Sequence, residues 1–320
     1  MQEAENLPLM PKSALVYYLD EKQSPIPYQK VASIRSCLEN IVETIFVHIV
    51  EAGDKAKWRR GDLNTRIGLL SHFFSADVID RLHSIRLLGN DGAHQAKHAA
   101  LTDERIGDGL SALSVLCEWA ILTYIKKHGL MSTDWLATVL STLPPVYRVR
   151  ILEPLIESNT LDRARVIAHQ EVREAYARRM YQGLIPLDSA PPETTEEEDR
   201  IMSFLLSIDK LAMAYLKNKQ FERSFEFVQQ MFDEGWMTEE FARDTWEKLE
   251  SLQSSFHSLP ISESMEQTRS YLEQILPAVK DEEQNLFLTL FSAMVLESPE
   301  ARAASSSQAP QLGAAPESAK

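Results

Sequence analysis

The amino-acid sequence predicts an all-α protein. Apolar residues recur at spacings of three and four along most of the 320 residues, and this spacing is typical of amphipathic helices. Residues that start and stop helices stand at the ends of these segments. Hydrophobic residues make up 44% of the chain, which is enough to build packed cores. We therefore expect a four-helix bundle near the N-terminus, followed by a second helical domain.

The first two helices of the expected bundle lie before residue 71. Residues 30–51 place one apolar stripe on a helix, made of Val31, Ile34, Leu38, Ile41, Val42, Ile45, Phe46 and Ile49. We expect Ala52 and Gly53 to end this helix. Asp62 precedes a short apolar segment, and aspartate is a preferred N-cap. A short helix is therefore expected after Asp62, with Leu63, Ile67 and Leu70 on its buried side.

The third and fourth helices have clear end signals. Apolar periodicity predicts the third helix from about Ala76 to Leu88, and Gly89 is expected to close it. The fourth helix is expected to begin after Thr102 as its N-cap, with acidic residues in the first turn. It ends in the sequence IKKHG, where basic residues and then a glycine suit a helix C-terminus.

The rest of the chain reads as further helices with two breaks. One break is LPPVY at 143–147, and the other is a linker rich in proline and acid. We expect six parts: an N-terminal extension at 1–27, the bundle at 28–130, a helical middle section at 131–185, the linker at 186–199, an acidic helical domain at 200–298 and a disordered tail at 299–320. The acidic domain should hold about five amphipathic helices. Within it, residues 211–232 resemble a helix-turn-helix unit of tetratricopeptide type.

Charge and cysteine content narrow the function classes. The formal net charge is −14; residues 1–130 carry 15 Lys and Arg against 16 Asp and Glu, whereas residues 131–320 carry 18 against 31. Contact with a phosphate backbone needs clustered cations, so the acidic second half is a poor candidate for binding nucleic acid. Cys37 and Cys117 are too few for a disulfide framework, which favours a reducing cytoplasm. No basic leader and no apolar run of about eighteen residues stands out, so we expect no membrane contact.

Residues 84–98, SIRLLGNDGAHQAKH, interrupt the apolar pattern with two glycines. With IRSCLENI in the first helix and a long last helix, this order resembles a bacterial domain family of unknown function that also occurs at the ends of type I restriction subunits. That family is usually placed in the HEPN superfamily of four-helix, RNA-directed domains. The resemblance covers about residues 28–128. The residues that carry it are Ile85, Arg86, Gly89, Asn90, Ala93 and His94, supported by Arg35 and Glu39 in the first helix.

The resemblance implies a place for a metal-independent ribonuclease site. In active HEPN ribonucleases an arginine and a histidine, often as Arg-Asn-x-x-x-His, act across a dimer interface. A histidine can move the 2′-hydroxyl proton, and an arginine can hold the charge that develops on the scissile phosphate. Asn90 and His94 match this pattern, but Gly89 stands at the arginine position and Arg86 lies three residues earlier. The candidate catalytic residues are therefore His94, Asn90 and Arg86.

Two functions stay open for this stretch. In the structural alternative, Gly89 supplies a left-handed helix end, Asn90 or Asp91 bonds the turn backbone, and His94 packs or caps beside the fourth helix. We then expect a non-catalytic interaction module in bacterial nucleic-acid metabolism or in defence against foreign genomes. It would form a homodimer or bind a protein partner through the N-terminal bundle, and any RNA would contact that domain. The other function is a metal-independent endoribonuclease that uses His94 with Arg86 and Asn90. Neither function calls for a cofactor.

A metal site is a weaker alternative for the same stretch. His94 and His98 are four residues apart, so on a helix both could bind one metal ion, with Asp91 or Asp103 as a third ligand. However, HQAKH lacks the glutamate of zinc hydrolases, and Lys97 would repel a cation. No metal is therefore expected.

Three further observations complete the search for motifs. Arg163 and His169 have the Arg-to-His spacing of the family, but they lie outside the resemblance and are expected on a solvated helix face. The basic cluster KAKWRR at 55–60 could meet phosphate, although a solvated loop is expected. The sequence has no glycine-rich phosphate loop, nucleophile elbow or paired metal-binding cysteines. Nucleotide hydrolysis, acyl transfer and structural zinc are thus unsupported.

Overall fold

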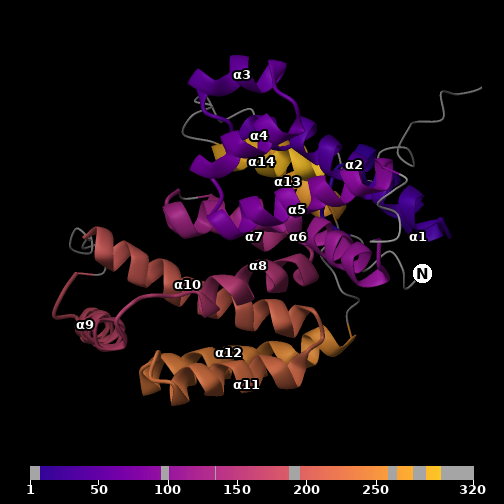
Figure 1. Ribbon diagram of the computed structural model, residues 1–320. Coiled ribbons are helices and arrows are strands. Elements are labelled where there is room, and N and C mark those ends of the chain that lie inside the picture. Colours follow the sequence, from indigo (N-terminus) through magenta and orange to yellow (C-terminus); the bar gives the residue numbers. More distant parts are fainter. Residues whose placement is uncertain are drawn as a thin grey trace, which may run out of the picture. The chain divides into compact units, whose positions relative to one another are not determined.

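The computed structural model describes residues 8–94, 101–133, 135–186, 195–258, 265–276 and 286–296. Within these ranges all regular structure is helical, so the predicted all-α class is confirmed (Figure 1). The α-helices are α1 (Lys12–Gln23), α2 (Pro27–Thr44), α3 (Lys55–Arg60), α4 (Leu63–Leu69), α5 (Ala76–Ala93), α6 (Asp103–His128), α7 (Leu136–Thr142), α8 (Pro145–Glu157), α9 (Arg163–Tyr181), α10 (Glu196–Lys217), α11 (Phe221–Asp233), α12 (Glu239–Ser258), α13 (Met265–Ile275) and α14 (Leu286–Leu296). Short 3₁₀ helices are η2 (Phe46–His48), η3 (Ala52–Asp54) and η4 (Leu70–His72).

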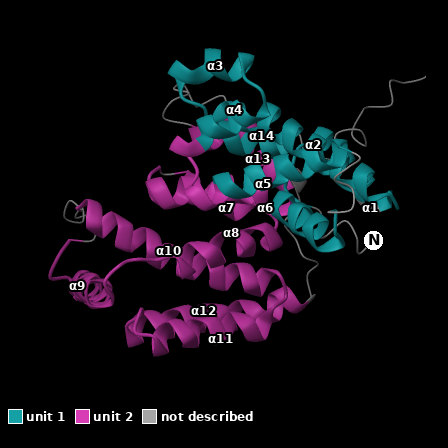
Figure 2. Cartoon of the chain, in the orientation of Figure 1, with its two compact units in different colours: residues 1–70, 79–113, 289–320 teal, residues 71–78, 114–288 magenta. Residues whose placement is uncertain are grey.

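The helices form two compact units, which Figure 2 shows in different colours. Unit 1 consists of residues 1–70, 79–113 and 289–320, and unit 2 consists of residues 71–78 and 114–288. The domain boundaries expected from the sequence stay predictions. The expected tail at 299–320 lies wholly outside the described residues, and each of the other expected segments lies partly outside them.

Helices from both ends of the sequence build unit 1. α1, in the expected N-terminal extension, packs on α2. Most of α14 also belongs to unit 1. In the sequence it is separated from the rest of that unit, which ends at residue 113. Its side chains at Leu290, Phe291, Met294 and Val295 are fully buried. A segment from the far end of the sequence therefore supplies part of this core.

The helix α2 ends earlier than the sequence predicts. It stops at Thr44 and η2 follows, whereas the apolar stripe predicted a helix up to residue 51. The hydroxyl of Thr44 donates to the backbone carbonyl of Asn40 at 2.8 Å. Such bonds and the β-branched residues around this point weaken a helix. Ile45 and Phe46 are nevertheless fully buried, because the turn keeps them on the core side.

Two predicted helix caps are confirmed. Asp62 caps α4, since its carboxylate accepts the backbone N–H of Thr65 at 2.8 Å. Thr102 caps α6, since its hydroxyl accepts the backbone N–H of Arg105 at 3.3 Å. Gly129 follows the C-terminal end of α6 with φ of 81°, which is the left-handed conformation expected for a glycine at that place.

The prediction that Gly89 ends a helix is wrong. α5 continues through Gly89 and Gly92 as far as Ala93. A Cβ atom on Gly89 would lie 2.5 Å from the Cβ of Arg35, and one on Gly92 would overlap the side chain of Val31. Both glycines thus face α2 and allow the two helices to approach closely. The packing of α5 on α2 outweighs the low helix propensity of glycine.

The basic cluster KAKWRR forms the helix α3 and not the expected loop. Trp58, in the middle of the cluster, is 3% exposed, and its backbone carbonyl accepts Nε of Arg66 at 3.0 Å. α3 also packs against α4. The burial of one large aromatic side chain therefore anchors this basic segment.

In unit 2, α10 packs against α8, α9, α11 and α12 (Figure 1). α10 and α11 form the helix-turn-helix pair predicted for residues 211–232, with Lys219 in the turn at φ of 59°. The hydroxyl of Ser224 on α11 donates to the carbonyl of Ala212 on α10 at 2.8 Å. The predicted break at 143–147 is confirmed, because α7 ends before it and α8 begins within it. That this pair is of tetratricopeptide type stays a prediction.

Among the described residues, α6 is long and apolar enough by composition to cross a membrane. Its most apolar window has a mean hydropathy of 1.3, and 56% of that window is buried inside the protein. A core helix passes the same test.

The two cysteines are buried. Cys117 lies in α6 and Cys37 in α2, and both are thiols. Burial raises the pKa of Cys37 to about 12.

Candidate functional site

The helix α5 carries two of the three candidate catalytic residues on one face. Because the helix continues to Ala93, Arg86 and Asn90 lie one turn apart on the same side. His94 is the first residue after the helix; its backbone N–H donates to the carbonyl of Asp91 at 3.3 Å, and its side chain is exposed. In the described part of the chain, no hydrogen bond or ion pair joins the side chains of these three candidates to one another.

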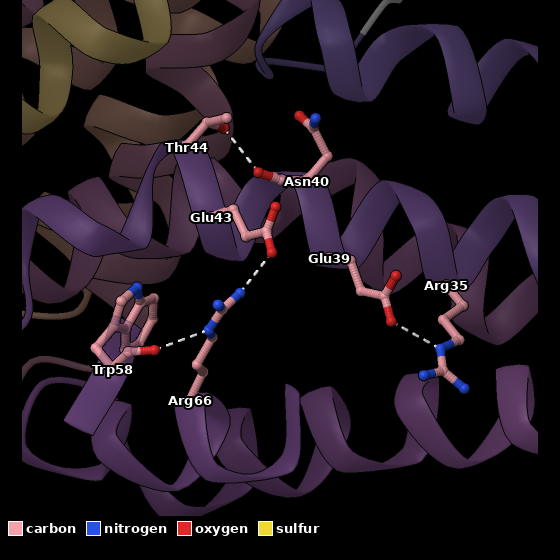
Figure 3. Close-up of polar contacts among 7 residues, drawn as sticks. All are labelled: Arg35, Glu39, Asn40, Glu43, Thr44, Trp58 and Arg66. Atoms are coloured by element: carbon pink, nitrogen blue, oxygen red, sulfur yellow. Dashed lines mark hydrogen bonds and ion pairs between the residues drawn. The ribbon is translucent and has the colours of Figure 1, made fainter. Parts of the chain in front are cut away.

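Asn90 is held by the facing helix α2. Nη1 of Arg35 donates to the side-chain oxygen of Asn90, and Nε of Arg35 donates to Glu39 at 2.8 Å. Figure 3 shows the second of these contacts along α2. The side chains of Arg35 and Glu39 are 35% and 40% exposed, so water screens their ion pair. The aliphatic part of Arg35 covers Gly89. The Arg35 side chain therefore makes an apolar contact with Gly89 and a polar contact with Asn90.

Glu43 lies one turn further along α2 than Glu39, on the same side of the helix as Arg35. Its carboxylate forms an ion pair with Nη1 of Arg66 at 2.5 Å (Figure 3). Arg66 also donates to the carbonyl of Trp58, and its guanidinium lies 6.0 Å from the centre of the Trp58 ring. One polar side of α2 therefore connects to α5 through Arg35 and to α3 and α4 through Glu43.

Arg86 lies beside a histidine that the sequence analysis did not single out. His83 precedes Arg86 by three residues, so both lie on neighbouring positions of the α5 surface. Nε of Arg86 and Nδ1 of His83 are buried and have no hydrogen-bond partner among the described residues. Burial lowers the pKa of His83, and the charge of Arg86 lowers it further, while Asp80 opposes the shift. The sequence LHSIR contains both residues, but only the structure shows that His83 is half-buried with its Nδ1 covered.

Asp62 lies within the electrostatic reach of Arg86. Hydrogen bonds from Thr65 are the main reason that the pKa of Asp62 is lowered, and the charge of Arg86 contributes to the shift. Arg86 thus has a neutral imidazole and a carboxylate in its surroundings. Such a guanidinium can hold an anion if the site opens to it.

The described residues do not support the metal site considered for His94, His98 and Asp91. Asp91 forms an ion pair with Arg105 of α6 at 3.0 Å. His98, the second histidine of that alternative, lies outside the described residues. Within the described ranges, no group of three or more His, Cys, Asp or Glu side chains is arranged to hold a metal ion.

Arg163 and His169 do not share a solvated face. Arg163 is exposed and lies over the ring of Trp236 at 4.8 Å. The side chain of His169 is only 9% exposed, with Nδ1 3.9 Å from Glu198. Burial lowers the pKa of His169, and Arg173 lowers it further. The expectation of a solvated face is therefore wrong for His169, because α9 packs this side against α10.

A buried acid lies in unit 2. The side chain of Glu118 on α6 is 2% exposed, and its Oε1 is 3.3 Å from Nη1 of Arg150 on α8. Its Oε2 has no hydrogen-bond partner in the described part of the chain. Burial raises the pKa of Glu118 to about 7, although Arg150 opposes the shift. This carboxyl group is therefore partly protonated at neutral pH.

Unit 2 also contains a groove that the sequence analysis missed, called here the α9–α12 groove. Its volume is about 410 Å³. It is lined by Gln170, Arg173 and Glu174 of α9, by Met202, Leu205, Leu206 and Asp209 of α10, and by Phe241, Asp244, Thr245 and Lys248 of α12. The sequence did hold an indication of this groove: α10 has apolar residues on more than one side, whereas a helix that packs on one core needs a single apolar stripe.

Comparison with known proteins gives no match: no family model, no curated protein and no solved structure is significantly similar to the chain.

Proposed function

We propose that this protein is a non-catalytic helical interaction module with a HEPN-like N-terminal bundle. It would act in bacterial nucleic-acid metabolism or in defence against foreign genomes. The family and this biological context rest on the resemblance of residues 28–128. The bundle would form a homodimer or bind a protein partner in the cytoplasm, and RNA would contact only this part of the chain.

The position of Gly89 carries the proposal. Active members of the family place an arginine there, and here the residue packs directly against Arg35. The neighbouring Asn90 is also occupied, because its side-chain oxygen accepts from Arg35. This face of α5 therefore packs against α2. Loss of one preorganised charged donor costs about two to three orders of magnitude in rate.

The test is incubation of the purified full chain with mixed RNA in the presence of a chelator. We expect no cleavage above a buffer control. His94→Ala and Arg86→Ala serve as matched variants of the two candidate residues. Products with 2′,3′-cyclic phosphate ends that disappear in both variants would overturn the proposal.

The second candidate function is the metal-independent endoribonuclease. It is favoured by the continuation of α5, which puts Arg86 and Asn90 on one face just before His94. The Nε of Arg86, which is buried without a hydrogen-bond partner among the described residues, and the exposed His94 side chain also support it. In this case His94 would move the 2′-hydroxyl proton, and Arg86 would hold the phosphate charge.

A further inference from the structure

The helices α11 and α12 of unit 2 pack side by side and form a groove, called here the α11–α12 groove (Figure 1). Its volume is about 480 Å³. It is lined by Phe225, Glu226, Gln229, Gln230 and Asp233 of α11, by Glu234 directly after α11, and by Trp246 of α12. Among the described residues that line it, two are aromatic, three are acidic and none is Lys or Arg.

The two aromatic residues form an apolar floor. The ring centroids of Phe225 and Trp246 are 4.8 Å apart, with an angle of 55° between the ring planes. Both residues are half-buried, so the floor is still partly open to solvent. Nε1 of Trp246 donates to Oε1 of Glu250 on the same helix at 2.9 Å, which orients the indole ring. The floor can therefore receive apolar side chains or the carbon chain of a basic residue.

The three carboxylates of the groove are not neutralised. Nε2 of Gln229 donates to Asp233 at 2.8 Å, and Nε2 of Gln230 donates to Glu234 at 2.8 Å. An amide carries no net charge, so these bonds orient the carboxylates and leave their charge in place. In the described part of the chain, neither these two residues nor Glu226 forms an ion pair with a Lys or Arg.

The basic residues of α11 and α12 contact acids outside the groove. Arg223 contacts Glu153 of α8 at 2.8 Å, Lys248 contacts Asp209 of α10 at 2.6 Å, and Arg243 contacts Asp244 at 3.7 Å. Arg243 lies one turn before Trp246, but it does not line the groove. All the charges that line the groove are thus negative, which favours a cationic group on the molecule that binds there.

We propose that the α11–α12 groove binds a basic amphipathic helix of a partner protein. Apolar side chains of that helix would pack on Phe225 and Trp246, and two Lys or Arg side chains would pair with Glu226 and Asp233. These two acids are seven residues apart on α11, so they lie two turns apart on one side. Cations seven residues apart on the partner helix match this spacing. The inference rests on the proposed function as an interaction module and adds a docking site in unit 2.

Other classes of ligand fit the groove less well. The carboxylates would repel the phosphate backbone of a nucleic acid. A metal ion needs several ligands around one point, and within the described ranges no group of three or more His, Cys, Asp or Glu side chains is arranged to hold one. A protein helix supplies both an apolar stripe and spaced cations, and a helix can lie in the groove between two others.

The probe is a designed, dye-labelled peptide of about 15 residues, long enough to form a helix. It carries Leu on one face and two Lys, spaced as proposed, beside that face. Its binding to the full chain is measured by fluorescence anisotropy. We expect saturable binding that weakens as salt is added, because ions screen exposed charges. A peptide of the same composition that places the two Lys on different sides of the helix should bind at least about threefold more weakly.

Charge reversal tests the acidic side of the groove. The double variant Glu226→Lys with Asp233→Lys should weaken binding about tenfold. Both positions are exposed, so the fold should tolerate the change. A peptide with Glu in place of the two Lys should bind this double variant better than it binds the wild type. Phe225→Ala removes one ring of the floor and should weaken binding of the original peptide about fivefold.

A second double variant controls for the change in net charge. Glu157→Lys with Glu171→Lys makes the same change at exposed positions of α8 and α9 that do not line the groove. It should leave binding of the peptide unchanged. Circular dichroism checks that each variant is folded.

The inference is overturned if the wild type does not bind the peptide, or if the groove variants bind it as the wild type does. It is also overturned if the control variant weakens binding as much as the groove variant, because the peptide would then respond to net charge alone. Displacement of the peptide by calcium at constant ionic strength would overturn it in favour of a metal site.

The proposed function fails separately, through RNA cleavage that depends on His94 and Arg86 in unit 1. Loss of peptide binding with no RNA cleavage would remove the groove and leave the interaction module standing.

Discussion

The guanidinium of Arg35 donates a hydrogen bond to the side chain of Asn90, while the carbon chain of Arg35 lies over Gly89. One residue of α2 thus contacts two successive residues of α5. A side chain at Gly89 would displace Arg35 and with it the bond to Asn90. The glycine is therefore part of a helix contact, and this contact determines what the candidate site can do.

Replacement of Gly89 by alanine should destabilise the protein. The added Cβ would lie 2.5 Å from the Cβ of Arg35, so the two helices must move apart. We expect a loss of about 1–2 kcal/mol, because overpacking exceeds the gain in helix propensity. Urea denaturation measures it. Gly107→Ala is the matched control, since nothing lies within 4 Å of its added Cβ. A variant Gly89→Ala at least as stable as Gly107→Ala would contradict the packing argument.

Glu118→Gln should gain stability relative to the wild type as the pH rises. Burial raises the pKa of Glu118 from its ordinary value of 4.5 to about 7. Between these values the unfolded chain ionises the group while the folded protein keeps it protonated. The stability from the neutral acid is therefore lost as pH rises from 4.5 to about 7. A shift of this size corresponds to roughly 3–4 kcal/mol.

The measurement is urea denaturation of wild type and Glu118→Gln at about pH 5 and about pH 8. Glutamine keeps the shape and has no charge to desolvate, so the difference between the two proteins should grow with pH. Glu157→Gln, at an exposed position at the end of α8, controls for the loss of one negative charge. A constant difference across this range would show that Glu118 is ionised in the folded protein.

Phe291→Ala should destabilise unit 1, although residue 291 lies far along the sequence from the other helices of that unit. Phe291 is fully buried in α14, and removal of a buried phenyl ring typically costs about 3–5 kcal/mol. Hydrogen exchange resolved by peptide should show faster exchange in α2 and α5. Removal of residues 299–320, the tail that the sequence predicts to be disordered, should leave exchange in α2 and α5 unchanged. Unchanged exchange in α2 and α5 of Phe291→Ala would mean that α14 does not support this core.

Generic duplex DNA should bind weakly at physiological salt. Residues 131–320 carry 31 acidic against 18 basic residues, and residues 1–130 carry no excess of cations. Few counterions can therefore be released from the DNA. A salt titration of binding tests this expectation, and submicromolar affinity with a steep salt dependence would reveal a basic face that outweighs the net charge.

The sequence by itself determined the local features of this protein. The helix caps at Asp62 and Thr102, the break at 143–147 and the helix-turn-helix at 211–232 depend on residues a few positions apart, which act the same way in any surroundings. For the same reason the all-α class followed from periodicity alone. Of the candidate site, the sequence supplied Arg86, Asn90 and His94. It named Arg35 and Glu39 only as residues that support the family resemblance, and the contact of Arg35 with Asn90 came from the structure.

The tertiary structure decided the features that depend on distant segments. Gly89 looks like a helix terminator in isolation, but α2 packs against it and the helix continues. His83 differs from a surface histidine because it is half-buried, with its Nδ1 covered and its pKa lowered by this burial and by Arg86. α14 joins unit 1 and the α9–α12 groove takes side chains from three helices. Such contacts have no signature in a local window, because their free energy comes from surfaces that meet only when the chain has folded.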